Sequence, residues 1–378
     1  MSSIDLITGH WREILFGSFC LVILIQLYYY IFIFSRLAFY KEKPKDYTQN
    51  NPLTVIICAK DEAANLVDNL PGILVQNYNS THSVLVVNDN STDESKYILE
   101  ELQRTFRQLQ VLPLTQSSSN IPGKKFPLSM GIMSAKTELL LLTDADCIPA
   151  SEFWMQKMQA AFTEEKDIVL GYGPYKKRRG LLNKLIRFET FHTALQYFSY
   201  ALAGKPYMGV GRNLAYKKTV FLNNKGFSSI NHIPGGDDDL FISNVANKRN
   251  TAVVLDKDTF TLSEAKLTWK SWRKQKSRHY TTGKYYKPGI KFLLGMYSLS
   301  AFLVYPLLVL AAVYYNVWLA LGVYALRMIF VAVTWRKVMH TLDEMDLWKW
   351  FLALDIWQFI YYFIFASTLF KKPARNWK

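Results

Sequence analysis

The chain has few cysteines. Cys20, Cys58 and Cys147 are the three cysteines among 378 residues. Their positions match neither a paired framework nor the close spacing of a zinc site. The pattern argues against a disulfide-stabilised secreted domain and indicates reduced thiols in a protein that faces the cytosol.

Glycine-rich phosphate motifs are also absent. No GxGxxG follows a predicted strand, and no GxxxxGK[ST] occurs; the stretch "GVGRNLA" at 209–215 lacks the third glycine. These absences argue against a Rossmann dehydrogenase and against a P-loop NTPase. A diphosphate bound to this chain therefore needs another counter-charge.

Acidic residues are fewer than basic ones, 30 against 45. The net charge is +15, and residues 266–291 contain no Asp or Glu. The basic residues gather at the ends of apolar segments, and no nucleic-acid-binding module is recognisable. We therefore expect a membrane partner and no nucleic acid, with the basic segments on the cytoplasmic side.

Two apolar regions are long enough to cross a bilayer. Residues 14–34 are uncharged between Arg12 and Arg36, and at about 1.5 Å per residue they span roughly 30 Å. They predict a retained anchor within residues 1–40. Residues 292–326 are also uncharged, with Asn316 near the middle. This second region predicts two crossings joined by a tight turn.

A third apolar segment, 348–370, is interrupted by Lys349 and Asp355. It fits either a third span or an interfacial helix, so residues 291–378 form a membrane region with two clear spans. Arg327 and Asp355 lie inside apolar runs. Within the membrane they would pair with one another or bind a lipid phosphate; otherwise Arg327 reaches the surface and Asp355 lies in the interface, and this second location is slightly favoured.

Residues 41–290 alternate between strand-like and helix-like patterns. Short apolar runs at 53–59, 83–90, 109–114 and 139–144 are separated by helical segments. This order predicts an α/β domain with a mostly parallel sheet, whose ligand lies at the carboxyl ends of the strands. Several acids follow these strands: Asp61, Glu62, Asp89, Asp93, Asp144 and Asp146.

Asp144 and Asp146 follow a run of four leucines in "LLLLTDADC". Two carboxylates this close repel one another unless a cation or a set of donors lies between them. Mg²⁺ and Mn²⁺ bind through one or two carboxylates together with phosphate oxygens. The alternative is a turn that caps a helix starting near Ser151.

The neighbouring segments carry a family resemblance. "VIICAKDEAANL", "VLVVNDNSTDES", "PGKKFPLSMGIMSAKTELLLLTDADC", "GVGRNLAY", "GGDDDLF" and "QKSRH" follow one another in the order and rough spacing of the family 2 glycosyltransferases. The resemblance covers about residues 52–285. It implies a GT-A fold, a nucleotide-sugar donor, a divalent metal (Mg²⁺ or Mn²⁺) and inversion at the anomeric carbon.

The resemblance also implies roles for residues on the donor side. Glu62 would lie beside the nucleobase, and Asp89 would hydrogen-bond it. Lys124 in "GKK" would approach the phosphates as a point charge. Asp144 would contact the ribose or the metal, and Asp146 would ligate the metal.

On the acceptor side the resemblance places the general base at Asp237, with Gly236 where the family usually has an acid. Asp238 is the reserve candidate, and the alternative for this acidic cluster is a helix N-cap. "QKSRH" resembles the QxxRW motif. Gln275 would then contact the acceptor, and Arg278 would contact the leaving diphosphate. The alternative for Arg278 is that it belongs to a basic surface that faces the membrane.

Taken together, the sequence predicts an inverting glycosyltransferase in a bacterial inner (cytoplasmic) membrane, with a cytoplasmic catalytic domain. The donor would be a nucleoside diphosphate sugar, with UDP favoured, and the acceptor a lipid or lipid-linked glycan. A processive polysaccharide synthase is an alternative, although His279 stands where the processive enzymes carry tryptophan. A second alternative is a non-catalytic membrane scaffold.

Overall fold

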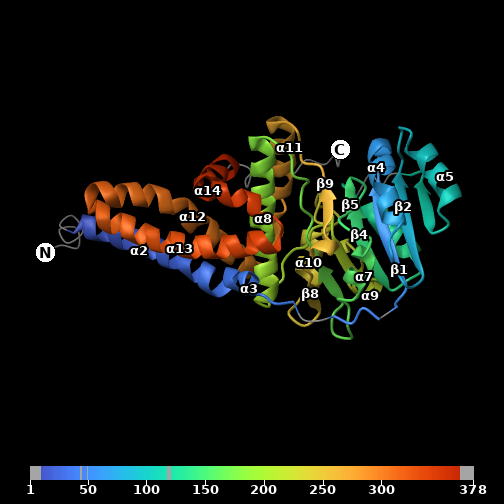
Figure 1. Cartoon of the computed structure of the whole chain (residues 1–378), viewed down its shortest axis with the longest axis horizontal. Helices are drawn as coiled ribbons and strands as arrows, with labels where there is room; N and C mark the ends of the chain where they lie inside the picture. The colour runs from blue at the N-terminus through green and yellow to red at the C-terminus, as the bar shows by residue number, and fades with distance from the viewer. Residues whose placement is uncertain (1–9, 43–44, 49, 117–120, 367–378) are drawn as a thin grey trace.

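The apolar runs of the middle region form a seven-stranded sheet in the computed structural model, which describes residues 10–42, 45–48, 50–116 and 121–366 (Figure 1). The strand order is β3-β2-β1-β4-β7-β6-β8. The strands are β1 (Leu53–Ala59), β2 (His82–Asp89), β3 (Leu109–Leu114), β4 (Leu139–Asp144), β6 (Ile168–Leu170), β7 (Leu214–Lys217) and β8 (Thr251–Val253).

The first four strands of this sheet are parallel, as the alternating sequence pattern predicts. All seven residues of β1 are buried, which is typical of a parallel strand covered on both faces. Strand β7 then runs antiparallel to β4 and to β6. The predicted α/β fold with a mostly parallel sheet is confirmed.

Helices cover both faces of the sheet. Val55 and Ile57 of β1 pack with α4 (Ala63–Leu74), α5 (Ser95–Thr105) and α7 (Trp154–Gln159). Ile56 and Cys58, on the opposite face, pack with α6 (Lys125–Ser134) and α10 (Asp239–Val245). This alternation along β1 leaves the carboxyl ends of the strands as the open edge of the sheet.

A small second sheet adjoins that edge. Its strands β5 (Cys147–Pro149) and β9 (Thr261–Ser263) pair antiparallel, and they connect the segment after β4 to the segment that leads into α11 (Trp269–Tyr280). The remaining short elements are α9 (Lys218–Asn223), η2 (Ser228–Ile230), η3 (Lys257–Thr259) and η4 (Gly283–Tyr285).

Three helices are long and apolar enough to cross a membrane. They cover Trp11–Ala38, Pro288–Tyr314 (α12) and Val317–Thr341 (α13), and the first consists of α2 (Trp11–Tyr28), η1 (Tyr29–Phe34) and α3 (Ser35–Ala38). The three lie alongside one another in a bundle that extends away from the sheet (Figure 1). Asn316 forms the predicted turn, where its side chain accepts hydrogen bonds from the backbone N–H groups of Trp318 and Leu319.

Helix α14 (Phe351–Ala366) follows η5 (Met345–Trp350) and has 16 residues. Such a helix is about 24 Å long, less than the roughly 30 Å of a hydrocarbon core. The rest of the predicted segment 348–370 lies outside the described residues. The choice between a span and an interfacial helix therefore stays a prediction.

The surface location favoured for Arg327 and Asp355 is wrong, because the two side chains pair. The Arg327 guanidinium donates to both carboxylate oxygens of Asp355, at 2.8 and 3.0 Å, and each residue is 1% exposed. Tyr305 also donates to Asp355, at 2.6 Å. Helix α14 packs back onto the bundle and thereby brings the two charges together. Burying either charge alone would cost much free energy, and pairing offsets this cost.

Helix α8 (Leu181–Leu202) crosses the end of the bundle, between the bundle and the sheet (Figure 1). The Arg187 guanidinium pairs with Glu344 and with Asp346, which lie just after α13, and Glu189 pairs with Lys276 of α11. These ion pairs join α8 to the segment after α13 and to α11.

We expect Arg187→Met to lower the stability of the chain strongly. Arg187 is 1% exposed, and removing one partner of a buried ion pair costs about 3–5 kcal/mol because the other charge stays buried. Thermal unfolding in detergent measures the loss. Lys184→Met on the same helix is the control, since Lys184 only approaches the ring of Trp350. Equal melting temperatures for the two variants would contradict the role of the ion pair.

Candidate active site

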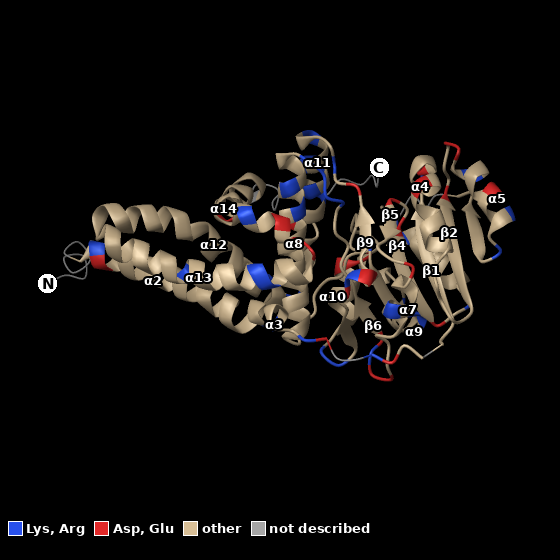
Figure 2. Cartoon of the chain, in the orientation of Figure 1, with Lys and Arg blue, Asp and Glu red and all other residues tan. Residues whose placement is uncertain are grey.

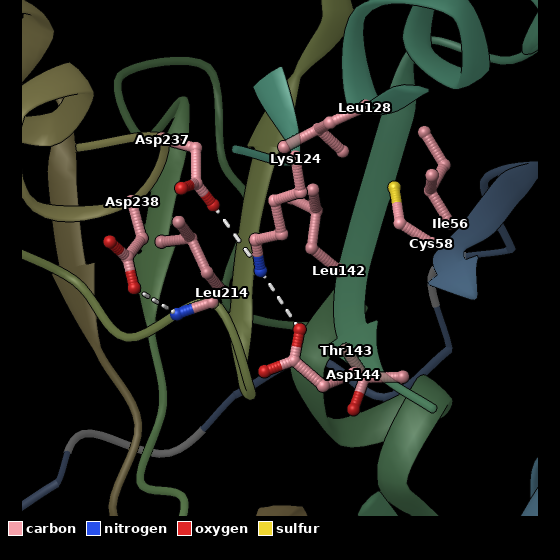
Figure 3. Close-up of a pocket in the computed structure, with 11 residues that line it drawn as sticks. Ile56, Cys58, Lys124, Leu128, Leu142, Thr143, Asp144, Leu214, Asp237 and Asp238 are labelled. Carbon is pink, nitrogen blue, oxygen red and sulfur yellow. Dashed lines mark hydrogen bonds and ion pairs between the residues drawn. The ribbon is translucent and has the colours of Figure 1, made fainter. Parts of the chain in front are cut away.

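One pocket at the carboxyl edge of the sheet gathers four of the predicted site residues. Lys124, Asp144, Asp237 and Asp238 line it (Figure 3), with apolar walls from Ile56, Leu128, Leu142 and Leu214. These charged residues come from three places in the sequence: the start of α6, the end of β4 and the loop before α10. The sequence prediction that they belong together is consistent with this arrangement.

Lys124 lies between two carboxylates. Its Nζ is 2.8 Å from Asp144 Oδ1 and 3.2 Å from Asp237 Oδ2 (Figure 3). Burial alone lowers the pKa of a lysine, but the charges of Asp144, Asp237 and Asp238 outweigh it and raise the pKa of Lys124 well above its ordinary value. The lysine is therefore a fixed positive charge in the pocket.

The next lysine of "GKK" has a different function. Lys125 is buried and donates to the backbone carbonyls of Ile233 and Gly235. It thereby holds the loop that carries the acids against the start of α6. The two adjacent lysines therefore have different partners: Lys124 contacts carboxylates, and Lys125 holds the loop through backbone carbonyls.

Asp144 and Asp146 lie where β4 ends and have different electrostatic surroundings. Burial would raise the pKa of Asp144, but Lys124, Arg212 and Arg278 together hold it below its ordinary value. Burial and the charge of Asp144 raise the pKa of Asp146. Asp146 is thus the member of the pair with less positive charge around it.

These two carboxylates fit a hard divalent cation, which binds through oxygen. No group of three or more His, Cys, Asp and Glu side chains is arranged to hold a metal ion within the described parts of the chain. A cation at Asp144 and Asp146 would therefore take its other ligands from phosphate oxygens and water, as Mg²⁺ and Mn²⁺ do.

The three consecutive acids of "GGDDD" have three different surroundings. Asp239 is buried and accepts hydrogen bonds from Thr282 Oγ1 (2.6 Å) and Tyr286 OH (2.8 Å), which lie just before α12. Asp238 accepts backbone N–H groups with both oxygens, from Gly211 at 2.8 Å and from Asp239 at 2.7 Å. These two carboxylates therefore fix the loop, one to the membrane side and one to the sheet.

Asp237 differs from its neighbours because only one of its oxygens is engaged. Oδ2 pairs with Lys124, and no hydrogen bond to Oδ1 occurs among the residues that the structure describes. Burial, with Asp237 and Asp239 nearby, raises the pKa of Asp238 to about 7. Both acids line the pocket, but of the two only Asp237 offers it an oxygen without a partner from the described chain.

Gly236 stands where the family resemblance expects an acid, and the local geometry explains the glycine. Its φ is +87°, and a Cβ at this position would lie 2.6 Å from Leu240 Cδ1. A residue with a side chain would be strained here and would collide with Leu240.

We expect Gly236→Ala to destabilise the loop by about 1 to 3 kcal/mol, the usual cost of a strained backbone conformation. Thermal unfolding measures this change. Gly283→Ala is the matched control, because a Cβ at Gly283 meets no atom within 4 Å. If Gly236→Ala melts at the same temperature as the control, the loop does not depend on this glycine.

Arg212 was not identified from the sequence as a site residue, although "GVGRNLAY" was among the matching segments. Its guanidinium lies 4.3 Å from the centre of the Tyr175 ring and donates to Ser263 Oγ at 2.9 Å. Its charge acts on both Asp144 and Asp146. Arg212 therefore adds a second fixed positive charge beside the acidic pair.

Helix α11 brings Gln275 and Arg278 to the same side of the site. Gln275 Nε2 donates to Tyr175 OH at 3.5 Å, and Tyr175 lies under Arg212. Arg278 is close enough to contribute to the low pKa of Asp144. The two predicted residues therefore lie near the acidic pair, although neither lines the pocket around Lys124.

Glu62 and Asp89 lie at the same edge of the sheet but outside that pocket. Asp89 Oδ2 is 3.9 Å from Lys60 Nζ, and its Oδ1 accepts a hydrogen bond from Asn90. The backbone N–H of Glu62 donates to Ser95 Oγ. Their roles beside a nucleobase stay predictions.

Comparison with known proteins concerns the family and the fold. Residues 54–222 match the family model described as glycosyl transferase family 2. A stretch of 139 residues is 27% identical to the beta-monoglucosyldiacylglycerol synthase of Nostoc sp.; it covers 36% of this chain and 28% of that protein. The chain thus matches less than a third of that relative's length.

One solved structure is similar over most of the chain. The mannosyltransferase PcManGT from Pyrobaculum calidifontis, solved with GDP-Man and Mn²⁺, is similar at a TM-score of 0.59 and 17% identity, over 92% of this chain and 99% of that one. S. aureus TarS 1–349 with UDP-GlcNAc gives a TM-score of 0.42 at 14% identity, over 82% and 89%. Residues 54–222, less than half of the chain, match family 2 of the glycosyltransferases, and the mostly parallel sheet agrees with the GT-A fold.

Proposed function

We propose that this chain transfers one sugar from a nucleoside diphosphate donor to a lipid or lipid-linked glycan, with inversion at the anomeric carbon. The observation that carries the proposal is the pocket in which Lys124 joins Asp144 to Asp237. The relatives support the two substrates, since one makes a glucosylated diacylglycerol and another binds GDP-Man and Mn²⁺.

On the donor side, Asp144 and Asp146 would hold Mg²⁺ or Mn²⁺. The cation supplies positive charge that stabilises the leaving diphosphate. Arg278 and Arg212 carry fixed charges beside the acidic pair and would contact phosphate oxygens. Glu62 and Asp89 would bind the nucleobase, for which uracil is the favoured identity.

On the acceptor side, Asp237 is the proposed general base. The acceptor hydroxyl oxygen forms a bond to the anomeric carbon while the bond from that carbon to the diphosphate oxygen breaks. The hydroxyl proton passes to Asp237, and the nucleoside diphosphate leaves with the bonding electron pair. Attack from the face opposite the leaving group inverts the configuration, and Asp237 is partly desolvated, as suits a base.

Lys124 connects the two sides, because one ammonium contacts the donor carboxylate Asp144 and the proposed base Asp237. Its position therefore sets the distance between the leaving group and the base. Preorganised charge of this kind stabilises a transition state in which negative charge moves onto the diphosphate.

The membrane helices support a lipid acceptor. Asp239 is tied to Thr282 and Tyr286 just before α12, so the acidic loop lies next to a candidate span. The basic residues beside the spans support a cytoplasmic location for residues 41–290. A lipid acceptor in the inner leaflet would thus reach Asp237 from the membrane side.

The test is transfer of radiolabelled sugar from UDP- and GDP-sugars to a lipid extract by the full chain in nanodiscs with Mn²⁺. We expect label in the organic phase with one class of donor, one sugar per acceptor by mass spectrometry, and no label with Asp146→Asn. Long glycan chains would indicate a processive synthase instead. A folded protein that transfers no sugar from any donor would contradict the proposal.

A further inference from the structure

The outer face of α11 and the turn before it form a strongly cationic surface. Lys266, Lys270, Arg273 and Lys274 are exposed, and no acidic residue occurs between 266 and 291. Figure 2 shows basic residues gathered on α11, at the end of the membrane bundle. We call these four side chains, with Leu267 and Trp269, the α11 face.

The positive charge of the α11 face is not neutralised by the protein. Across the described ranges of the chain, none of its four basic side chains forms an ion pair with a carboxylate. Lys276 on the opposite side of the helix is buried and pairs with Glu189 of α8. The helix is therefore anchored through one side and presents uncompensated charge on the other.

Apolar side chains are exposed among these charges. Leu267 is 75% exposed and Trp269 is 48% exposed. The loop that leads into α8 extends the same surface, because Arg178 pairs with Glu264 close to Lys266, and Leu181 beyond it is 58% exposed. Basic residues interleaved with leucine and tryptophan are typical of segments that lie at the bilayer interface.

Helix α14 indicates where the bilayer lies relative to this face. Trp269 and Trp272 pack against Trp357 of α14, each with ring centres 6.3 Å apart. The other side of α14 exposes four apolar residues at helical spacing: Leu352, Ile356, Ile360 and Phe363. Such an uninterrupted apolar stripe belongs against acyl chains, so α11 beside it lies at the level of the headgroups.

We propose that the α11 face docks on the anionic headgroups of the bilayer that holds the chain, with Leu267 and Trp269 entering the interface. The charge is complementary, since each lysine or arginine near an anionic surface is attracted to it. The apolar stripe of α14 continues the same contact into the acyl region. A nucleic acid would meet the same charges but would leave Leu267 in water.

The experiment compares hydrogen exchange of the full chain in nanodiscs of phosphatidylcholine with and without phosphatidylglycerol. We expect backbone amides of residues 266–274 to exchange more slowly with the anionic lipid, on the order of tenfold. This readout requires no transfer activity, so its outcome is separate from that of the proposed function.

Two variants test the assignment. Replacing Lys266, Lys270, Arg273 and Lys274 together by Gln should abolish the effect of the anionic lipid, and Leu267→Gln should reduce it. The matched control replaces four exposed basic residues elsewhere by Gln and should keep the effect: Lys96, Arg104, Lys136 and Lys225. Equal exchange in both lipids, or a lipid effect that survives loss of the four charges, would overturn the proposal.

Discussion

Replacing Asp237 by Asn should lower the rate of sugar transfer by about 10²- to 10⁴-fold, the usual contribution of a general base. Asparagine has nearly the same shape but cannot take the acceptor proton. Donor binding should persist, because Asp144 and Asp146 stay in place. The measurement pairs turnover under saturating substrates with calorimetric titration of the nucleotide.

Asp238→Asn is the matched comparison for this prediction. Asparagine keeps one acceptor oxygen for the N–H groups of Gly211 and Asp239, so we expect a partly loosened loop and a smaller loss of rate. The pKa of Asp238 is raised to about 7. If Asp238 were the base, transfer by the wild type would slow as the pH falls below about 7. Asp237→Asn would then keep substantial turnover, with its pH dependence moved to lower pH, because the charge of Asp237 contributes to the raised pKa of Asp238. That result would move the base to Asp238.

Replacing Lys124 by Met should weaken both the fold and donor binding. The substitution keeps the volume but leaves Asp144 and Asp237 without the ammonium that now contacts them at 2.8 and 3.2 Å. Asp237 is buried, and leaving a buried charge without its partner costs about 3–5 kcal/mol; the side chain of Asp144 is 37% exposed and adds less. Loss of a charged phosphate contact should reduce nucleotide affinity by about tenfold or more. Thermal unfolding and nucleotide titration measure the two effects.

Lys125→Met separates these two effects. Lys125 is also buried, but it donates to the carbonyls of Ile233 and Gly235 rather than to the acids. We expect this variant to melt at a lower temperature while its folded fraction still binds nucleotide. Equal nucleotide affinity in wild type and Lys124→Met would contradict the role assigned to Lys124.

Much of the sheet could be predicted because its signals are local. The runs that form β1 and β4 are continuously apolar, and the acids that follow each parallel strand must meet at one edge of the sheet. Asn316 could be placed in a turn for the same reason, since it interrupts an otherwise apolar region. Asp144 and Asp237 were assigned to one site through the family resemblance rather than from spacing alone.

Other features depend on contacts between distant segments. Arg327 and Asp355 pair only because α14 packs back onto α12 and α13, which no local pattern encodes. In the sequence, Arg212 is part of a glycine-rich stretch with no charge partner nearby. The fold brings the start of β7, and Arg212 with it, close to the acidic pair. The burial of helix α8 likewise depends on the sheet and the bundle that cover it from both sides.

The most direct test of the account is calorimetric titration of the full chain with UDP and with GDP, with and without Mn²⁺, repeated with Asp146→Asn. We expect that one nucleotide binds only when the metal is present and that Asp146→Asn abolishes this binding. Failure of both nucleotides to bind a folded protein under any metal condition would contradict it. The segment "TDADC" would then be a capped turn in a membrane scaffold.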